Sequence, residues 1–96
     1  MGIIYIIRNT VNSKVYIGQT VQRLDGRIKG HLYSLNSGTH NKLYDAIRSV
    51  GPKNFYFETL EKCDNKLLNE RESYWIKQYN SCYNGYNSTL GGSAGC

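Results

Sequence analysis

The chain has 96 residues, which is enough for one domain with a core and leaves no room for a second folded module. Its three cysteines are widely spaced and form no CxxC pair, so neither a disulfide framework nor a zinc site is indicated, and reduced thiols are expected. It contains no apolar run of membrane-spanning length and no signal-peptide pattern, from which we expect an intracellular protein with no membrane partner.

The net charge of +5 is concentrated in the first part of the chain. Residues 1–57 hold eight Lys and Arg against two Asp, whereas residues 58–96 hold four against five acidic residues. A basic half on a small domain indicates a polyanionic partner, most often nucleic acid. A solvated basic surface without a partner explains the charge equally well.

The first eighteen residues predict a β-hairpin that carries two tyrosines on one face. Two β-branched and aromatic runs, residues 3–7 and 14–18, flank a short turn. A four-residue loop would place Tyr5 directly opposite Tyr16, either as a stabilising cross-strand pair or as part of a site. Gly18 indicates a strand end or a close approach to the backbone. The opposite, aliphatic face is the expected core side and carries Ile4, Ile6, Val15 and Ile17.

A first helix is expected between a cap at Thr20 and a stop at Gly38. Arg23, Arg27 and His31 recur every four residues and form a row along one edge of its apolar stripe. Neighbouring cations repel one another, so the row indicates an anionic partner, although solvent alone explains Arg23. For Arg27 and His31 the functional and the structural explanations remain open. The apolar stripe itself consists of Leu24, Ile28, Leu32 and Leu35.

Two more helices and a strand complete the predicted order. The second helix is expected to start at a Thr39 cap and to end at residues 51–52, and His40 at its start suits a surface or capping role. Residues 54–60 alternate as a half-buried strand. A third helix is expected from about residue 65 to residue 79. The second helix would bury Leu43, Ile47 and Val50.

One carboxylate, Glu72, lies in the apolar stripe of the third helix, beside Leu68 and Ile76. A carboxylate in such a position is unfavourable unless it is paired, hydrogen-bonded or metal-bound. A salt bridge to an arginine is the structural explanation. A metal ligand, or an acid–base group that lines a cleft, is the functional one.

These features, in this order, resemble the GIY-YIG nuclease family, in particular the catalytic domains of phage-type homing endonucleases. The one departure is the glycine of the first motif, whose position is taken by Ile3, with Gly2 one residue earlier. The resemblance implies an α/β (α+β) fold, in which a small three-stranded antiparallel sheet is flanked by about three helices. The catalytic domain would span residues 1–90, and residues 91–96 would form a flexible tail or the start of a linker. The matching motifs are Ile3-Ile4-Tyr5, Tyr16-Ile17-Gly18, Arg27 to His31, Glu72 and Gly85-Tyr86-Asn87.

The resemblance also implies an activity, metal-dependent hydrolysis of DNA by a single-metal mechanism. Glu72 would be the one protein ligand of Mg²⁺ or Mn²⁺, cations that suit oxygen ligands and keep several waters. Arg27 would bind the phosphate oxygens. Tyr5 would act as general base or position the water, and His31 would accept the phenolic proton. Tyr16 would hydrogen-bond the phosphate or the attacking water.

By the same resemblance, Asn87 would anchor the third helix or orient Tyr5. The implied partner is duplex DNA, bound by a monomeric domain that is tethered to a separate DNA-recognition domain in the full-length protein. Two alternatives stay open. One is a non-enzymatic nucleic-acid-binding module that uses basic residues and exposed tyrosines. Glu72 argues against this module, because a carboxylate repels phosphate unless a metal ion lies between them. The other is a structural or protein-interaction domain.

Overall fold

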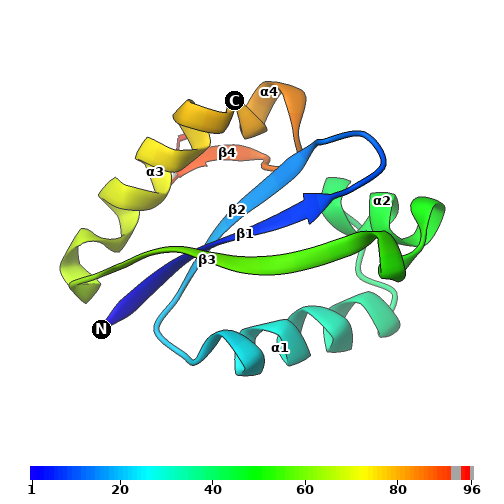
Figure 1. Ribbon diagram of the computed structural model, residues 1–96, viewed down its shortest axis with the longest axis horizontal. Coiled ribbons are helices and arrows are strands. Elements are labelled where there is room, and N and C mark those ends of the chain that lie inside the picture. Colours follow the sequence, from blue (N-terminus) through cyan, green and yellow to red (C-terminus); the bar gives the residue numbers. More distant parts are fainter. Residues whose placement is uncertain (92–93, 96) are drawn as a thin grey trace.

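Three antiparallel strands form the centre of the fold, in the order β2-β1-β3, so that β2 lies at an edge (Figure 1). The computed structural model describes residues 1–91, 94 and 95. The strands are β1 (Gly2–Asn9), β2 (Val15–Thr20) and β3 (Phe55–Cys63). The longer helices are α1 (Leu24–Asn36), α2 (Lys42–Val50) and α3 (Leu68–Tyr79), with short helical turns η1 (Pro52–Asn54), η2 (Asn65–Leu67) and α4 (Ser81–Asn84). The predicted three-stranded sheet with flanking helices is confirmed.

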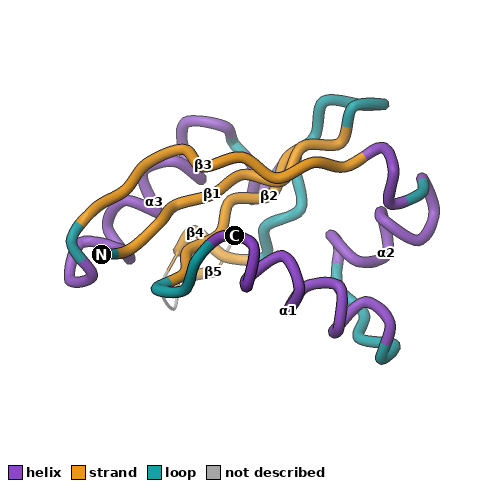
Figure 2. The backbone as a smooth tube through the Cα atoms, turned by 60° about the horizontal axis from the view of Figure 1, so that its bottom comes forward, coloured by secondary structure: helices purple, strands orange, loops and turns teal. Residues whose placement is uncertain are grey.

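Helices cover both faces of the sheet. In Figures 1 and 2, α3 lies on one side of the sheet, and α1 and α2 lie on the other. The predicted aliphatic face packs against α3 and α4, in a cluster of Ile4, Ile6, Val15, Ile17, Leu68, Ile76 and Cys82. The tyrosine face forms a second cluster of Tyr5, Ile7, Leu43, Tyr44, Ile47 and Tyr86. Tyr5 is 0% exposed because α1 and α2 cover this face, so the core extends to both faces of the sheet and not only to the aliphatic one.

The predicted hairpin register is wrong by two residues. Tyr5 lies opposite Gly18 rather than Tyr16. The connection is longer than predicted because two asparagine side chains shape it: Asn9 Oδ1 accepts from the backbone of Val11 and Asn12 Oδ1 from the backbone of Lys14, each at 2.9 Å. A shift of two residues leaves every side chain on its predicted face, since strand side chains alternate with a period of two.

Two helix caps also differ from the prediction. Helix α1 begins after Arg23, whereas the Thr20 hydroxyl accepts a hydrogen bond from the Gln22 backbone within the preceding loop (3.0 Å). Helix α2 is capped by Asn41, whose Oδ1 accepts from the Tyr44 backbone at 2.8 Å, rather than by Thr39. Threonine and asparagine are both suitable caps, so residue type alone does not choose between neighbouring candidates.

The buried face of α1 is polar at its centre. His31 is 4% exposed, whereas Leu32, predicted to be buried, is 46% exposed. Leu24 and Leu35 are partly buried against the tyrosine-face cluster. The helix is therefore rotated so that the edge predicted to carry Arg27 and His31 faces the sheet, and the apolar spacing alone misplaces Leu32.

The C-terminal segment continues with β4 (Thr89–Gly91) and β5 (Ala94–Gly95), which pair antiparallel. Residues 92, 93 and 96 lie outside the described residues, and the predicted linker at 91–96 stays a prediction. Cys63 is free but Cys82 takes part in a disulfide, so the prediction of reduced thiols is wrong for Cys82. In the part of the chain that the structure describes, no helix has the length and apolarity needed to cross a bilayer.

Candidate active site

Tyr5, Arg27 and His31 meet beneath α1. The Tyr5 hydroxyl lies 2.7 Å from His31 Nε2 and accepts a hydrogen bond from Arg27 Nε at 3.2 Å. Strand β1 fixes the tyrosine, and one turn of α1 separates the arginine from the histidine, so the spacing of four residues aims both at the same phenol. The structure thus brings together three of the predicted site residues.

Tyr16 extends this group toward the edge of the sheet. Its ring centroid lies 6.3 Å from that of Tyr5 and 5.9 Å from that of His31. On the other side, the Phe57 ring stacks 6.2 Å from Tyr5 and lies 5.8 Å from His31. These rings shield the polar groups from bulk water, which strengthens the electrostatic interactions among them.

Glu72, on α3, approaches strand β2 from the opposite face of the sheet. Gln19, on edge strand β2, donates through Nε2 to Glu72 Oε1 (3.1 Å) and to Asn69 Oδ1 (2.8 Å). Among the described residues, no lysine or arginine forms an ion pair with Glu72, so the predicted salt-bridge explanation is wrong. Burial first, and then the charge of Glu72, raise the pKa of Tyr16, so the carboxylate lies within electrostatic reach of the phenol.

Burial controls the protonation of the group. Burial raises the pKa of Tyr5 and of Tyr16, and the neighbouring acidic groups raise both pKa values further. Burial, followed by the nearby Arg27 charge, lowers the pKa of His31 to about 4. Burial also raises the pKa of Glu72, and the Gln19 hydrogen bond opposes this. At neutral pH the centre therefore holds neutral tyrosines and a neutral imidazole beside one guanidinium.

Asn87 holds the strand that carries Tyr16. Its Oδ1 accepts from the Ile17 backbone N–H (2.9 Å) and from the Ser81 hydroxyl (2.7 Å), and its Nδ2 donates to the Ile17 carbonyl (2.8 Å). Ile17 lies between Tyr16 and Gly18, so these bonds fix the position of β2 relative to α4. The side chain is 5% exposed.

Three further residues belong to this region or border it. Gln19 and Tyr44 were not predicted from the sequence. Gln19 could have been found as a polar side chain on the same strand face as Ile17. Tyr44 could have been found from its place three residues before buried Ile47. Tyr44 is buried, and its hydroxyl lies 2.8 Å from His31 Nδ1. His40 is exposed and pairs with Asp45 (2.8 Å), apart from the Tyr5 group.

The oxygen donors suit one hard divalent cation. Within the described residues no three His, Cys, Asp or Glu side chains gather as a metal cluster. Glu72 is a half-buried carboxylate without a cationic partner, and a bound cation would compensate its charge. Mg²⁺ often takes one or two protein carboxylates and fills its remaining positions with water and substrate oxygens. A single carboxylate within electrostatic reach of two phenols fits that requirement.

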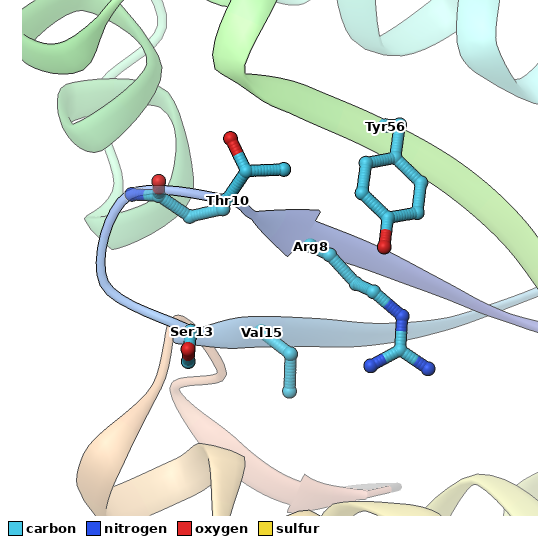
Figure 3. A pocket seen from close by; sticks show the side chains of 6 residues that line it. Arg8, Thr10, Ser13, Val15 and Tyr56 are labelled. Carbon is cyan, nitrogen blue, oxygen red and sulfur yellow. The ribbon is translucent and has the colours of Figure 1, made fainter.

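His31 is the one site residue that lines either of two hollows in the described part of the chain. One, of about 190 Å³, lies at the hairpin connection and is lined by Arg8, Asn9, Thr10, Ser13, Val15 and Tyr56. Figure 3 shows Arg8 and Tyr56 on neighbouring strands and Thr10 and Ser13 toward the connection. The other, of about 50 Å³, is largely apolar and lies behind His31, between α1, α2 and β3. Neither adds an acidic group to the site.

Comparisons with known proteins identify the family of the chain. Residues 1–87 match the GIY-YIG catalytic domain family. Over 88 residues, the chain is 40% identical to intron-associated endonuclease 1 of Enterobacteria phage T4, covering 88% of this chain and 35% of that protein, so it spans about a third of this relative.

Two solved structures are similar to the whole fold. One is the catalytic domain of homing endonuclease I-TevI, with a TM-score of 0.81 and 37% identity over 91% of this chain and 97% of that one. The other is a mutant catalytic domain of intron endonuclease I-TevI, with a TM-score of 0.84 and 36% identity over 99% of this chain and 100% of that one. The chain belongs to the GIY-YIG catalytic domain family.

Proposed function

We propose that this domain is an endonuclease that hydrolyses phosphodiester bonds in duplex DNA with one Mg²⁺ or Mn²⁺ ion. The proposal rests on one observation: two kinds of functional group lie on either side of strand β2. A buried tyrosine and histidine with a half-buried arginine lie on one side, and Glu72, a carboxylate without a cationic partner, lies on the other. Both matched relatives are named as endonucleases, and this supports the same reaction class here.

Each side chain has a role that suits its surroundings. Glu72 would hold the metal ion, which when bound would polarise the phosphate and stabilise the leaving oxygen. Arg27 would bind the non-bridging oxygens, where negative charge develops in the transition state. Tyr16, at the edge of the sheet, would donate a hydrogen bond to the phosphate or the attacking water. Asn87 would act indirectly, by holding β2.

Tyr5 and His31 would handle the proton of the attacking water. A free phenolate is disfavoured because burial raises the pKa of Tyr5. Tyr5 would therefore accept the water proton while its own proton passes to His31 Nε2, 2.7 Å away. The Arg27 charge is the second cause of the low pKa of His31, and a phosphate bound to Arg27 would offset that charge. Substrate binding would thus make His31 a better acceptor at the moment it is needed.

The non-enzymatic alternative loses part of its support. A stacking platform for bases needs exposed aromatic faces, and Tyr5 is 0% exposed with both Tyr5 and Tyr16 packed against His31. A binding module also gains nothing from a half-buried carboxylate near its phosphate contacts.

Cleavage of supercoiled plasmid tests the proposal. Wild-type protein with Mg²⁺ should nick the plasmid, and a chelator should stop it. Glu72→Gln should abolish nicking while leaving the fold and DNA binding intact, and binding should tighten slightly because a negative charge is lost. Glu70→Gln, an exposed carboxylate in the same helix, is the matched control and should cleave normally. Nicking by Glu72→Gln at the wild-type rate would rule out the single-metal mechanism.

DNA binding by the domain alone should be weak and unspecific. The charge excess in residues 1–57 neutralises phosphates, which provides affinity without sequence information. We expect dissociation constants of roughly 10⁻⁴–10⁻⁶ M at physiological salt, rising steeply with salt. Sequence recognition would then come from a separate domain, tethered beyond residue 91 in the full-length protein. Tight, salt-insensitive binding of residues 1–96 to one duplex among scrambled controls would contradict this.

A further inference from the structure

Both ring nitrogens of His31 are hydrogen-bonded inside the protein. Nε2 lies 2.7 Å from the Tyr5 hydroxyl, and Nδ1 lies 2.8 Å from the Tyr44 hydroxyl. The ring is 4% exposed, so these two phenols largely replace water as its partners. Tyr44 and Tyr5 thus lie at opposite nitrogens of the His31 ring.

The chemistry of a neutral imidazole links the two hydrogen bonds. A neutral ring carries one N–H, so only one of its nitrogens accepts. If Nε2 is to take the proton from Tyr5, then Nδ1 must carry the ring proton. A buried N–H without an acceptor destabilises the folded state. The Tyr44 oxygen is placed to be that acceptor.

We propose that Tyr44 is a positioning residue for the cleavage reaction: its hydroxyl accepts the Nδ1 proton of His31 and so keeps Nε2 free to accept from Tyr5. This inference rests on the proposed function, in which His31 receives the phenolic proton. The low pKa of His31 agrees with it, because the ring is neutral at pH 7 and its tautomer then decides which nitrogen accepts.

The position of Tyr44 is rigid enough for this role. Tyr44 lies in the first turn of α2, and its backbone N–H donates to the cap residue Asn41 at 2.8 Å. Its ring packs edge-on against His31, with centroids 5.8 Å apart, and it is 6% exposed. Helix α2 therefore determines where the phenol oxygen lies.

Within the described part of the chain, no other group packed against His31 takes the place of Tyr44 as the Nδ1 acceptor. On its own helix, Arg27 donates to Tyr5 at 3.2 Å and lacks an acceptor atom. Tyr16 from β2 meets the imidazole edge-on, and β3 contributes the apolar ring of Phe57. Among these groups, only the Tyr44 oxygen has a hydrogen-bond distance to Nδ1.

The experiment combines ¹⁵N NMR of the histidine side chains with plasmid cleavage, for wild type, Tyr44→Phe and Tyr86→Phe. Tyr86 is the matched control, because it is a buried tyrosine of the same cluster whose hydroxyl accepts from Asn9 at 2.9 Å, away from His31. His40, which is exposed and pairs with Asp45 away from the Tyr5 group, supplies the other histidine signal and should be the same in all three proteins.

We expect wild-type His31 to be neutral at pH 7 with its proton on Nδ1. In Tyr44→Phe the ring should shift toward the Nε2–H tautomer, and kcat should fall by about 100-fold with KM for DNA unchanged, at the low end of what proton transfer contributes. The Tyr86→Phe variant should lose thermal stability only.

Two results would overturn the role of Tyr44: an Nε2–H tautomer in wild-type His31, or a Tyr44→Phe cleavage rate equal to that of Tyr86→Phe. The NMR measurement needs neither metal nor DNA. If wild-type protein fails to cleave with any divalent metal, the proposed function fails, while the tautomer still decides whether Tyr44 orients His31.

Discussion

The phenol ring of Tyr5 lies over the backbone of Gly18, the residue directly opposite it in the β1–β2 pair. A Cβ atom on Gly18 would collide with the end of that ring, including its hydroxyl. The close approach expected from Gly18 in the sequence is therefore made by a side chain of the site itself, and the glycine is needed to place it.

Gly18→Ala should displace the Tyr5 hydroxyl from His31. We expect a fall of about 10²-fold in the cleavage rate, as misplacement by about 1 Å produces, and a loss of about 1–3 kcal/mol in the free energy of unfolding. Gly26→Ala is the control, because a Cβ there meets only the Gln22 side chain at 3.8 Å. If Tyr5 carries the effect, Gly18→Ala should add little to the rate loss of Tyr5→Phe; additive losses would show another cause.

Gln19→Leu should weaken the use of the metal ion. The amide holds Glu72 through a 3.1 Å hydrogen bond, and loss of a residue that orients a ligand typically weakens metal affinity by about 10- to 100-fold. A Mg²⁺ titration of plasmid nicking should show the half-maximal concentration rising by that factor. Asn69→Ala removes the other partner of Gln19 and should have a smaller effect. An unchanged titration for Gln19→Leu would contradict the role of Gln19.

His31 should make the protein less stable as the pH falls. Burial lowers its pKa to about 4, against 6.5 in the unfolded chain, so between these values only the unfolded state takes up the proton. Stability should therefore fall by up to about 3 kcal/mol from pH 6.5 to pH 4, and this contribution should be constant below pH 4.

Urea unfolding across this pH range, compared between wild type and His31→Gln, measures the contribution of His31. Glu72 acts in the opposite sense because its pKa is raised, and the comparison cancels it since both proteins retain Glu72. Identical pH profiles for the two proteins would show that His31 is already exposed to solvent in the native state.

Asn87→Ala should reduce stability rather than chemistry. It leaves the backbone N–H and C=O of Ile17 and the Ser81 hydroxyl without this partner, which should lower the free energy of unfolding by about 2–4 kcal/mol. At temperatures where the variant is folded, the cleavage rate should follow the folded fraction. Asn84→Ala, at an exposed position, is the control. A rate loss far beyond the unfolded fraction would place Asn87 in contact with the reaction.

The sequence predicted the sheet and its two faces well, because side chains alternate along a strand with a period of two. Ile4 and Ile6 therefore lie on one face and Tyr5 on the other. The register error of two residues left the predicted faces correct. The spacing of Arg27 and His31 placed them on one helical edge, and the structure brings both to Tyr5.

What the sequence did not predict depends on contacts between distant segments. Leu32 matched a buried stripe, yet the polar His31 occupies the centre of that helix face because Tyr5 and Tyr44 satisfy its ring nitrogens. The partners of Glu72 and Asn87, Gln19 and Ile17, lie more than fifty residues away in the chain. No local pattern encodes such pairs.

The full burial of Tyr5 makes one side chain serve both the core and the proposed chemistry. In the core, apolar residues of similar volume often stabilise a protein as well as buried polar groups do, or better. A single change at position 5 or 31 would leave buried polar partners unsatisfied, so selection for heat resistance alone should favour joint replacement of Tyr5, His31 and Tyr44 by apolar residues, which would remove the reaction. A library of this domain sorted only for thermal stability should fill with inactive members.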